Sequence, residues 1–122
     1  MKIAIPVDEN EKETGVCISF GRAPYFMFYD IETKNSEFLL NSAAESQGGA
    51  GIKAAQLLVD NRADVLLSPR CGQNAAEVLQ AANIKLFKTL GTSVRENIQA
   101  FEVGKLAVLS EIHAGFHNHG GK

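Results

Sequence analysis

The sequence predicts a single α/β domain built on a mixed five-stranded sheet. Its 122 residues give room for one hydrophobic core, and the 45% of residues that are hydrophobic suffice to fill it. In the second half of the chain, short apolar runs alternate with segments of helical periodicity. Near residue 30, two apolar runs flank a short polar turn, which is typical of an antiparallel hairpin.

Three strands are expected in the first half of the chain. The apolar run over 2–7 is followed by acidic and polar residues, which indicates a buried strand that ends in a loop. Residues 25–31 are rich in aromatic side chains, and residues 37–40 return after the polar turn over 32–36, so the two runs form the hairpin. The small, glycine-rich stretch over 42–51 is a loop.

Three helices and two further strands are expected in the second half. The strands cover 64–67 and 84–87. Ser93 and Glu96 have the spacing of a capping box at the start of the third helix, and Gly104 suits its end. The apolar residues that predict the helices are Ile52, Ala55, Leu58 and Val59 (ending near Asn61), Ala75, Val78, Leu79 and Ala82 (ending at Asn83), and Val94, Ile98 and Phe101.

This order of elements also predicts the arrangement of the sheet. A short hairpin makes the second and third strands antiparallel neighbours, and the strand–helix–strand crossovers are right-handed and parallel. The first strand is then central, the strand order is 3-2-1-4-5, and strand 2 is antiparallel. Four loops meet at one edge, over 8–24, 41–51, 68–72 and 89–93. Because open α/β sheets bind ligands beyond the carboxyl ends of their strands, we expect the functional site there.

Composition excludes several classes of function. The 12 basic and 14 acidic residues form no basic stripe, so no nucleic-acid partner is expected. No apolar run approaches the roughly 20 residues that span a bilayer, and the N-terminus has no signal-peptide features. We therefore expect a cytoplasmic protein with no membrane association, a monomer or a weak homodimer, in which Cys17 and Cys71 are free thiols.

Asp8 is expected at the opposite end of the sheet from Asp30 and Asp64, so no carboxylate pair converges for nuclease chemistry.

Both cysteines lie in the loops of the predicted site. Cys71 directly precedes the second helix, whose positive N-terminal end favours a thiolate, so we expect a lowered pKa there. It either has a metal-binding or redox role or fills a tight turn between strand and helix. Cys17 lies in the loop after the first strand and is either a soft metal ligand or a small packed residue. Arg22 and Arg70 share this edge and offer donors to an anionic ligand, or are solvated surface residues.

Two further features suggest ligands. Gly49 opens the first helix and offers an anion seat, although the surrounding glycines lack the acidic residue of a dinucleotide site. His113, His117 and His119 form a glycine-rich histidine tract of the kind that binds transition metals weakly. This tail is expected to be flexible, and it either reaches over the cysteines or binds metal only adventitiously.

Several segments carry a resemblance to a known family. They are, in order, MKIAIPVDEN, FGRAPYFMFYDIE, GGAGIKAAQLL, CGQNAAEVLQAANIKLF and GTSVRENIQAFEVGKL. The chain resembles the dinitrogenase iron–molybdenum cofactor family, which includes NifX-like proteins and the C-terminal part of NifB, over a domain of residues 1–106. A C-terminal extension, 107–122, follows it and ends in the Gly/His tail.

The resemblance implies a three-layer ribonuclease H-like fold with helices on both faces of the sheet. It also implies non-catalytic binding, storage or delivery of an iron–sulfur or iron–molybdenum type cluster or its precursor, received from or passed to a donor or acceptor protein in nitrogenase cofactor biosynthesis. Many relatives carry a histidine where this chain has Ser19, and Cys17 offers a thiol two residues earlier.

The residues that we expect to bind the cofactor are Cys17, Ser19, Arg22, Gly49, Arg70, Cys71 and Gly72. Those expected to bind metal are Cys17, Cys71, His113, His117 and His119. Two alternatives stay open: a thiol-redox protein or sensor that uses the two cysteines, and a regulatory module that binds a small anion at the glycine loop.

Overall fold

A mixed sheet of five strands forms the centre of the molecule. The computed structural model describes residues 1–11, 13–109 and 112–113. The strands lie in the order β3-β2-β1-β4-β6. Strand β2 runs antiparallel to β1 and β3, whereas β4 runs parallel to β1 and β6. The α/β class and the mixed five-stranded sheet are therefore confirmed; the ribonuclease H-like name stays a prediction. The bounds of the strands are β1 (Lys2–Val7), β2 (Tyr25–Asp30), β3 (Ser36–Leu40), β4 (Val65–Ser68) and β6 (Lys85–Lys88).

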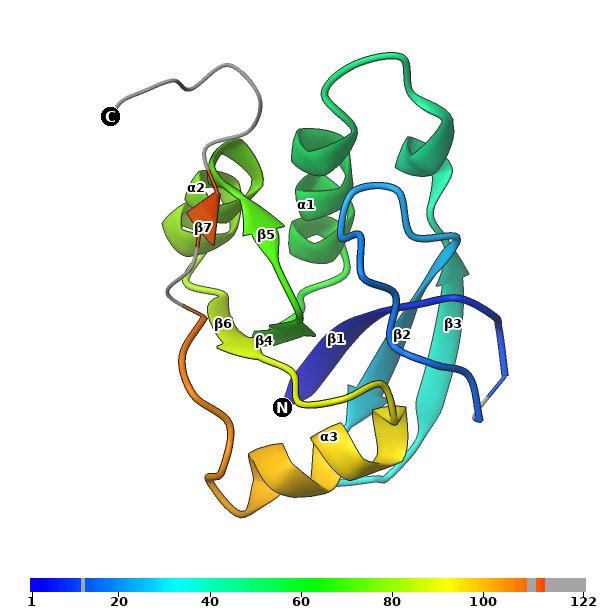
Figure 1. Cartoon of the computed structure of the whole chain (residues 1–122), viewed down its shortest axis with the longest axis vertical. Helices are drawn as coiled ribbons and strands as arrows, with labels where there is room; N and C mark the ends of the chain where they lie inside the picture. Colours follow the sequence, from blue (N-terminus) through cyan, green and yellow to red (C-terminus); the bar gives the residue numbers. More distant parts are fainter. Residues whose placement is uncertain (12, 110–111, 114–122) are drawn as a thin grey trace.

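Helices cover both faces of the sheet (Figure 1). The bounds are η1 (Ser42–Glu45), α1 (Ala50–Asp60), α2 (Gln73–Ala81) and α3 (Val94–Glu102). Alternate residues of β4 point to opposite faces: Leu66 joins the core under α1 and α2, and Leu67 joins the core under α3. Leu58 and Leu79 fill the first of these cores, and Ile98 the second, as their helical spacing predicts.

One residue of the apolar stripes expected on the helices does not lie on the buried face of its helix. Ile52, which the apolar spacing assigns to the buried face of α1, is 44% exposed. It lies in the first turn of the helix, and this turn lines a pocket. The end signals of α3 are confirmed: Ser93 Oγ accepts a hydrogen bond from the backbone N–H of Glu96 at 3.1 Å, and Gly104 follows the helix with a φ of 75°.

The chain after α3 runs along the β6 edge of the sheet. Leu106 and Leu109 are buried, Val108 pairs with Phe87, and Leu109 N–H donates to the Leu86 carbonyl at 2.9 Å. Farther on, β7 (Ile112–His113) pairs in parallel with β5 (Cys71–Gly72), which the sequence does not predict. The described part of the expected C-terminal extension therefore lies against the domain, and the rest of the Gly/His tail lies outside the described residues.

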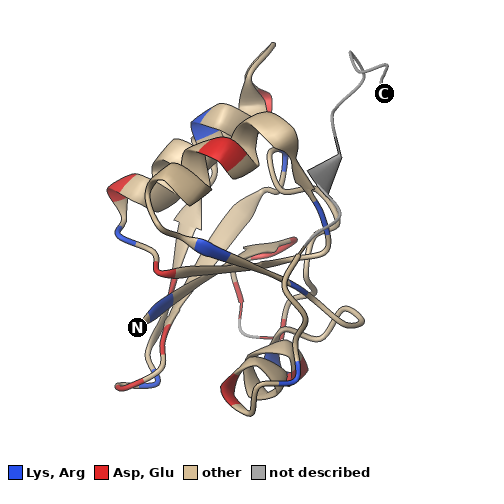
Figure 2. Cartoon of the chain, turned by 90° about the vertical axis from the view of Figure 1, so that its left-hand side faces the viewer, with Lys and Arg blue, Asp and Glu red and all other residues tan. Residues whose placement is uncertain are grey.

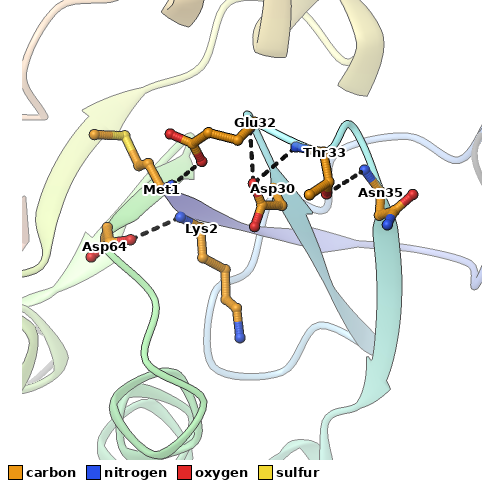
Figure 3. Close-up of polar contacts among 7 residues, drawn as sticks. All are labelled: Met1, Lys2, Asp30, Glu32, Thr33, Asn35 and Asp64. Atoms are coloured by element: carbon orange, nitrogen blue, oxygen red, sulfur yellow. Dashed lines mark hydrogen bonds and ion pairs between the residues drawn. The ribbon is translucent and has the colours of Figure 1, made fainter.

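The amino end of β1 is held by carboxylates that act as hydrogen-bond acceptors (Figure 3). Asp64 accepts from the backbone N–H of Lys2 at 2.8 Å, and the N-terminal ammonium pairs with Glu32. Asp30 accepts from the N–H groups of Thr33 and Glu32, and these bonds hold the pKa of Asp30 below its ordinary value. Asp8 follows the other end of β1, so these carboxylates lie at opposite ends of the strand, as expected.

Charged residues are dispersed over helices and loops, with basic and acidic positions interspersed (Figure 2). Among the described residues, none of the helices is both long and apolar enough to cross a bilayer.

Candidate functional site

A pocket of about 570 Å³ lies where three loops meet, at the carboxyl edge of the parallel strands. Its volume falls within the range of roughly 300–1,000 Å³ typical of ligand pockets. The lining residues come from three stretches of the chain: 18–22, 47–52 and 70–75. Three of the four loops expected to meet do so here. The loop over 89–93 does not line the pocket and instead contacts the loop after β1, where Val16 N–H donates to the Thr92 carbonyl at 2.9 Å.

The N-termini of α1 and α2 both open into this pocket. Their first-turn residues line it, and neither N-cap, Gly49 or Gly72, carries a side chain that caps the helix. By contrast, η1 and α3 have the side-chain caps Asn41 and Ser93. Unpaired N–H groups and the positive end of the helix dipole both favour an anion. Two such ends on one pocket make its backbone surface electropositive.

Two arginines add to this positive charge. Arg22 and Arg70 are exposed and line the pocket, and no Asp or Glu occurs among its described lining residues. Arg22 is positioned from two sides: its guanidinium donates to the Ala44 carbonyl at 2.8 Å, and its backbone N–H donates to Ser19 Oγ at 3.1 Å. The turn before β5 is held by Ser68 Oγ, which donates to the Arg70 carbonyl at 2.8 Å. The charged side chains among its described lining residues are therefore all basic, and such groups favour a negatively charged ligand.

The two cysteines have different positions. Cys71 lines the pocket but is only 1% exposed and belongs to the core under α1 and α2. Burial raises the pKa of its thiol to about 12, so the expected lowering by the helix N-terminus is wrong. The helix begins only after Gly72, and the cost of burying a thiolate outweighs the attraction of the helix end. Both cysteines are free thiols, as expected.

Cys17 lies outside the pocket lining, although the next residue, Ile18, belongs to it. Its backbone N–H donates to the Pro6 carbonyl at 2.8 Å, which places it beside the end of β1 and therefore on the expected edge of the sheet. Burial, together with Asp8, raises the pKa of its thiol as well. Of the two cysteines, Cys71 is thus the one that contacts the pocket.

The predicted histidine ligands fall mostly outside the described residues. The backbone of His113 pairs with Gly72 in the β5–β7 sheet, and His117 and His119 are not described. Among the described residues, no group of three or more His, Cys, Asp or Glu side chains is placed to hold a metal ion. Ser19, Arg22, Gly49, Arg70, Cys71 and Gly72, all expected in the site, line one pocket.

Two residues that shape the pocket were not expected in the site. Asn41 is buried, and its Nδ2 donates to the carbonyls of Gly21 and Ala23 at 3.0 and 2.9 Å, while Oδ1 accepts from Ala43 N–H at 3.1 Å. Gly21 packs directly on the first turn of α1, where an added Cβ would lie 2.9 Å from the Gly51 nitrogen. The only sequence signals are the glycine of the Phe-Gly-Arg-Ala motif and an asparagine at a strand end.

The raised pKa of Cys71 predicts a pH-dependent stability. The folded protein keeps the thiol proton up to a pKa of about 12, whereas an ordinary thiol with a pKa of 9.0 releases it earlier. The stabilisation that this group contributes is therefore complete below pH 9 and is lost as the pH rises from 9 toward 12, by up to about 1.4 kcal/mol per pH unit.

Urea unfolding of the wild type and Cys71→Ala measures this effect. We expect the stability advantage of the wild type to shrink as the pH is raised from about 9 to about 10.5. Cys17→Ala, in the less buried thiol, serves as the control and should alter the pH profile less. An advantage of the wild type over Cys71→Ala that is constant across this range would contradict the prediction.

The fold and pocket define a class before any relative is considered: a small α/β domain with a pocket beyond the carboxyl ends of its parallel strands, lined by two arginines and two helix N-termini. The chain belongs to the dinitrogenase iron-molybdenum cofactor family, whose pattern it matches over residues 1–104. It is 33% identical over 109 residues to the uncharacterized protein MJ0580 of Methanocaldococcus jannaschii, covering 87% of this chain and 89% of that protein.

Solved structures agree with this membership. The apo form of the orange protein from Desulfovibrio gigas superimposes with a TM-score of 0.85 at 34% identity, over 89% of this chain and 92% of that one. A Thermotoga protein with a provisional NifB assignment gives a TM-score of 0.80 at 35% identity, over 93% of this chain and 97% of that one. The family resemblance and the α/β fold are thereby confirmed.

Proposed function

We propose that this protein binds a metal–sulfur cluster, or a precursor of one, in the pocket between α1 and α2, and that it stores or delivers this cargo without catalysis. The observation that carries the proposal is the convergence of two uncapped helix N-termini and two arginines on one pocket. Clusters of iron or molybdenum with sulfide are anionic, and their sulfides accept hydrogen bonds. Membership in the dinitrogenase iron-molybdenum cofactor family supports nitrogenase cofactor biosynthesis as the setting.

The donor set of the pocket suits a cargo better than a permanent cofactor. A resident iron–sulfur cluster is held by several cysteine thiolates. Among the described lining residues, Cys71 is the single cysteine, and its raised pKa keeps the thiol protonated until a metal displaces the proton. A cluster seated here is thus held mainly by charge and hydrogen bonds, which allows it to leave for an acceptor protein.

The roles of the individual residues follow from their places. Arg22 and Arg70 hold the anionic periphery, and the backbone N–H groups that follow Gly49 and Gly72 receive the sulfides. Cys71 supplies the metal ligand within the pocket, and Ser19 shapes the turn that places Arg22. We assign supplementary ligation to Cys17 and to His113, His117 and His119, with a donor or acceptor protein in the cytoplasm as partner.

Of the two alternatives, the binding of a small oxyanion has support from the same helix ends. The thiol-redox function has less, because burial raises the pKa of both thiols and reactive cysteines have lowered values. Competition by inorganic phosphate separates the first alternative from cluster binding. If the pocket is a simple anion site, Cys71→Ser binds phosphate as tightly as the wild type does. If the pocket is a cluster site, Cys71→Ser binds the iron–sulfide cargo more weakly than the wild type does.

Anaerobic reconstitution with iron and sulfide tests the proposal. We expect a visible chromophore with bound iron and sulfide, and we expect the double variant Arg22→Gln/Arg70→Gln to lose at least about tenfold in affinity, since each charge-assisted contact is worth roughly 1.5–3 kcal/mol. Cys71→Ser should weaken binding more than Cys17→Ser, because only Cys71 lines the pocket. Arg62→Gln, an exposed arginine beyond the opposite end of α1, is the matched control.

The binding should also weaken as salt is added, because salt screens the electrostatic attraction between the charged cargo and the pocket. Equal binding by the wild type, the arginine double variant and Cys71→Ser would place the cargo elsewhere. It would thus refute the assignment to this pocket.

A further inference from the structure

The two edges of the central sheet differ in how the chain covers them. At the β6 edge, residues 107–109 run alongside the strand, and Leu109 N–H donates to the Leu86 carbonyl at 2.9 Å. At the opposite edge, β3 pairs with β2 alone, and Figure 1 shows it as the outer strand of the sheet. Within the described part of the chain, no further strand pairs with β3. This edge is therefore open.

The hydrogen bonds of the hairpin identify which backbone groups of β3 point to the open edge. In an antiparallel ladder, alternate residues of a strand bond to the same neighbour. Asn41 N–H donates to the Pro24 carbonyl at 3.0 Å, and at the turn Asp30 N–H donates to the Asn35 carbonyl at 2.9 Å. The odd-numbered residues of this stretch therefore face β2. The N–H and C=O groups that point away from β2 belong to Ser36, Phe38 and Leu40.

This strand lacks the features with which proteins protect an exposed edge. Such features include proline, lysine, a β-bulge or a very short strand. Strand β3 has neither proline nor lysine, and it pairs with β2 over five residues in an unbroken register. Its single charged residue is Glu37, and at its end the apolar side chain of Leu40 is 63% exposed. The edge is thus able to accept another strand.

A second copy of β3 complements this edge. When two β3 strands lie antiparallel with Phe38 of one copy opposite Phe38 of the other, every outward N–H meets an outward carbonyl. In this register Leu40 lies opposite the small side chain of Ser36, and the two Phe38 rings form a favourable cross-strand pair. Phe38 packs against the core under α3, and Leu40 shares its face of the sheet. The pairing therefore extends that core across the two copies.

We propose that this protein forms a two-fold symmetric dimer through β3, with Phe38 on the symmetry axis. One short strand from each copy buries less than the roughly 1,600 Å² of a standard interface, so the dimer forms only at high protein concentration. Glu37 weakens it further, because the two exposed Glu37 side chains are diagonal neighbours about 7–8 Å apart. This inference does not depend on the proposed function, since β3 does not line the pocket.

Sedimentation velocity of the full chain, without iron or sulfide, tests the dimer. We expect the 13.2 kDa monomer at about 10 μM and a rise toward twice that mass at about 1 mM. Added salt should strengthen the dimer, because it screens the repulsion between the two Glu37 carboxylates. For the same reason, Glu37→Gln should lower the dissociation constant by about threefold. A monomer across the whole concentration range would overturn the proposal.

Variants of Leu40 separate the backbone contribution from that of the side chain. Leu40→Pro removes an N–H that points away from β2, so the hairpin keeps its own bonds, and we expect self-association to weaken at least about tenfold. Leu40→Ala keeps the N–H and should weaken it less. Leu90→Ala is the matched control, because Leu90 is 61% exposed and follows β6 at the far side of the sheet. Wild-type dimerisation of Leu40→Pro would refute the pairing.

Amide hydrogen exchange locates the interface residue by residue. In dilute solution, β2 should protect the N–H groups of Glu37 and Leu39, whereas those of Phe38 and Leu40 should exchange fast. At about 1 mM, the exchange of Phe38 and Leu40 should slow severalfold. This measurement on the wild type decides if thermal unfolding shows that Leu40→Pro does not fold. A dimer in which the exchange of Phe38 and Leu40 is unchanged would have its interface elsewhere, which would overturn the proposal.

Discussion

Replacing Asn41 by alanine should weaken cargo binding and destabilise the protein together. The Asn41 side chain makes three hydrogen bonds, two of them to carbonyls of the loop that lines the pocket. Alanine leaves those two carbonyls and the Ala43 N–H without their partner in a buried setting, and each such loss costs roughly 1–3 kcal/mol. We expect the free energy of unfolding to fall by about 2–4 kcal/mol, measured in urea.

The effect on binding follows from what the Asn41 bonds hold. The Gly21 carbonyl lies directly before Arg22, and the Ala23 carbonyl directly after it, so the asparagine fixes both sides of the arginine. Once these bonds are lost, Arg22 is no longer aimed at the pocket, and we expect the affinity for the iron–sulfide cargo to fall about tenfold, roughly the 1.4 kcal/mol of one weakened charged contact.

Asn97→Ala is a matched control within the same chain. Asn97 is equally buried, and its side chain also makes three bonds, donating to the carbonyls of Leu90 and Ser93 and accepting from Leu90 N–H. Its loop does not line the pocket. This variant should lose a similar stability while keeping the affinity for cargo. If both variants lose affinity in proportion to stability, Asn41 has no special role in the site.

The fold was predictable because its signals are local. The hairpin of β2 and β3 is encoded by two apolar runs and the turn between them, and the three helices by apolar spacing. The cap at Ser93 follows from a side chain and a backbone N–H three residues apart. The edge of the sheet that carries the site follows from the order of the elements alone, because parallel strands end together.

The features of the site that the sequence did not predict depend on contacts between residues that lie far apart along the chain. The helix end next to Cys71 is visible in the sequence, but the packing that buries its thiol, and so raises its pKa, is not. The pairing of β5 with β7 involves two residues on each side, too few to leave a periodic pattern. Ile52 fits a helical stripe by spacing, yet its side chain is exposed and lines the pocket, because the helix turn that carries it borders the pocket.

The contact between Gly21 and α1 is another feature of this kind, and it gives the second prediction with a large effect. A Cβ at position 21 would lie 2.9 Å from the nitrogen and 3.0 Å from the Cα of Gly51. Both are backbone atoms of the first helical turn and cannot rotate away, so the loop and the helix must separate. Gly21→Ala should therefore reduce the free energy of unfolding by about 1–3 kcal/mol.

The same separation should abolish most of the cargo binding. It moves Arg22 away from the N-terminus of α1, and these are two of the groups that the proposed anion site combines. We expect at least a tenfold loss of affinity for iron and sulfide, about 1.4 kcal/mol, in the anaerobic reconstitution. Gly48→Ala is the matched control: Gly48 also lines the pocket, but its added Cβ meets no atom within 4 Å. Wild-type affinity in Gly21→Ala, or an equal loss in Gly48→Ala, would show that the close approach of loop and helix does not build the site.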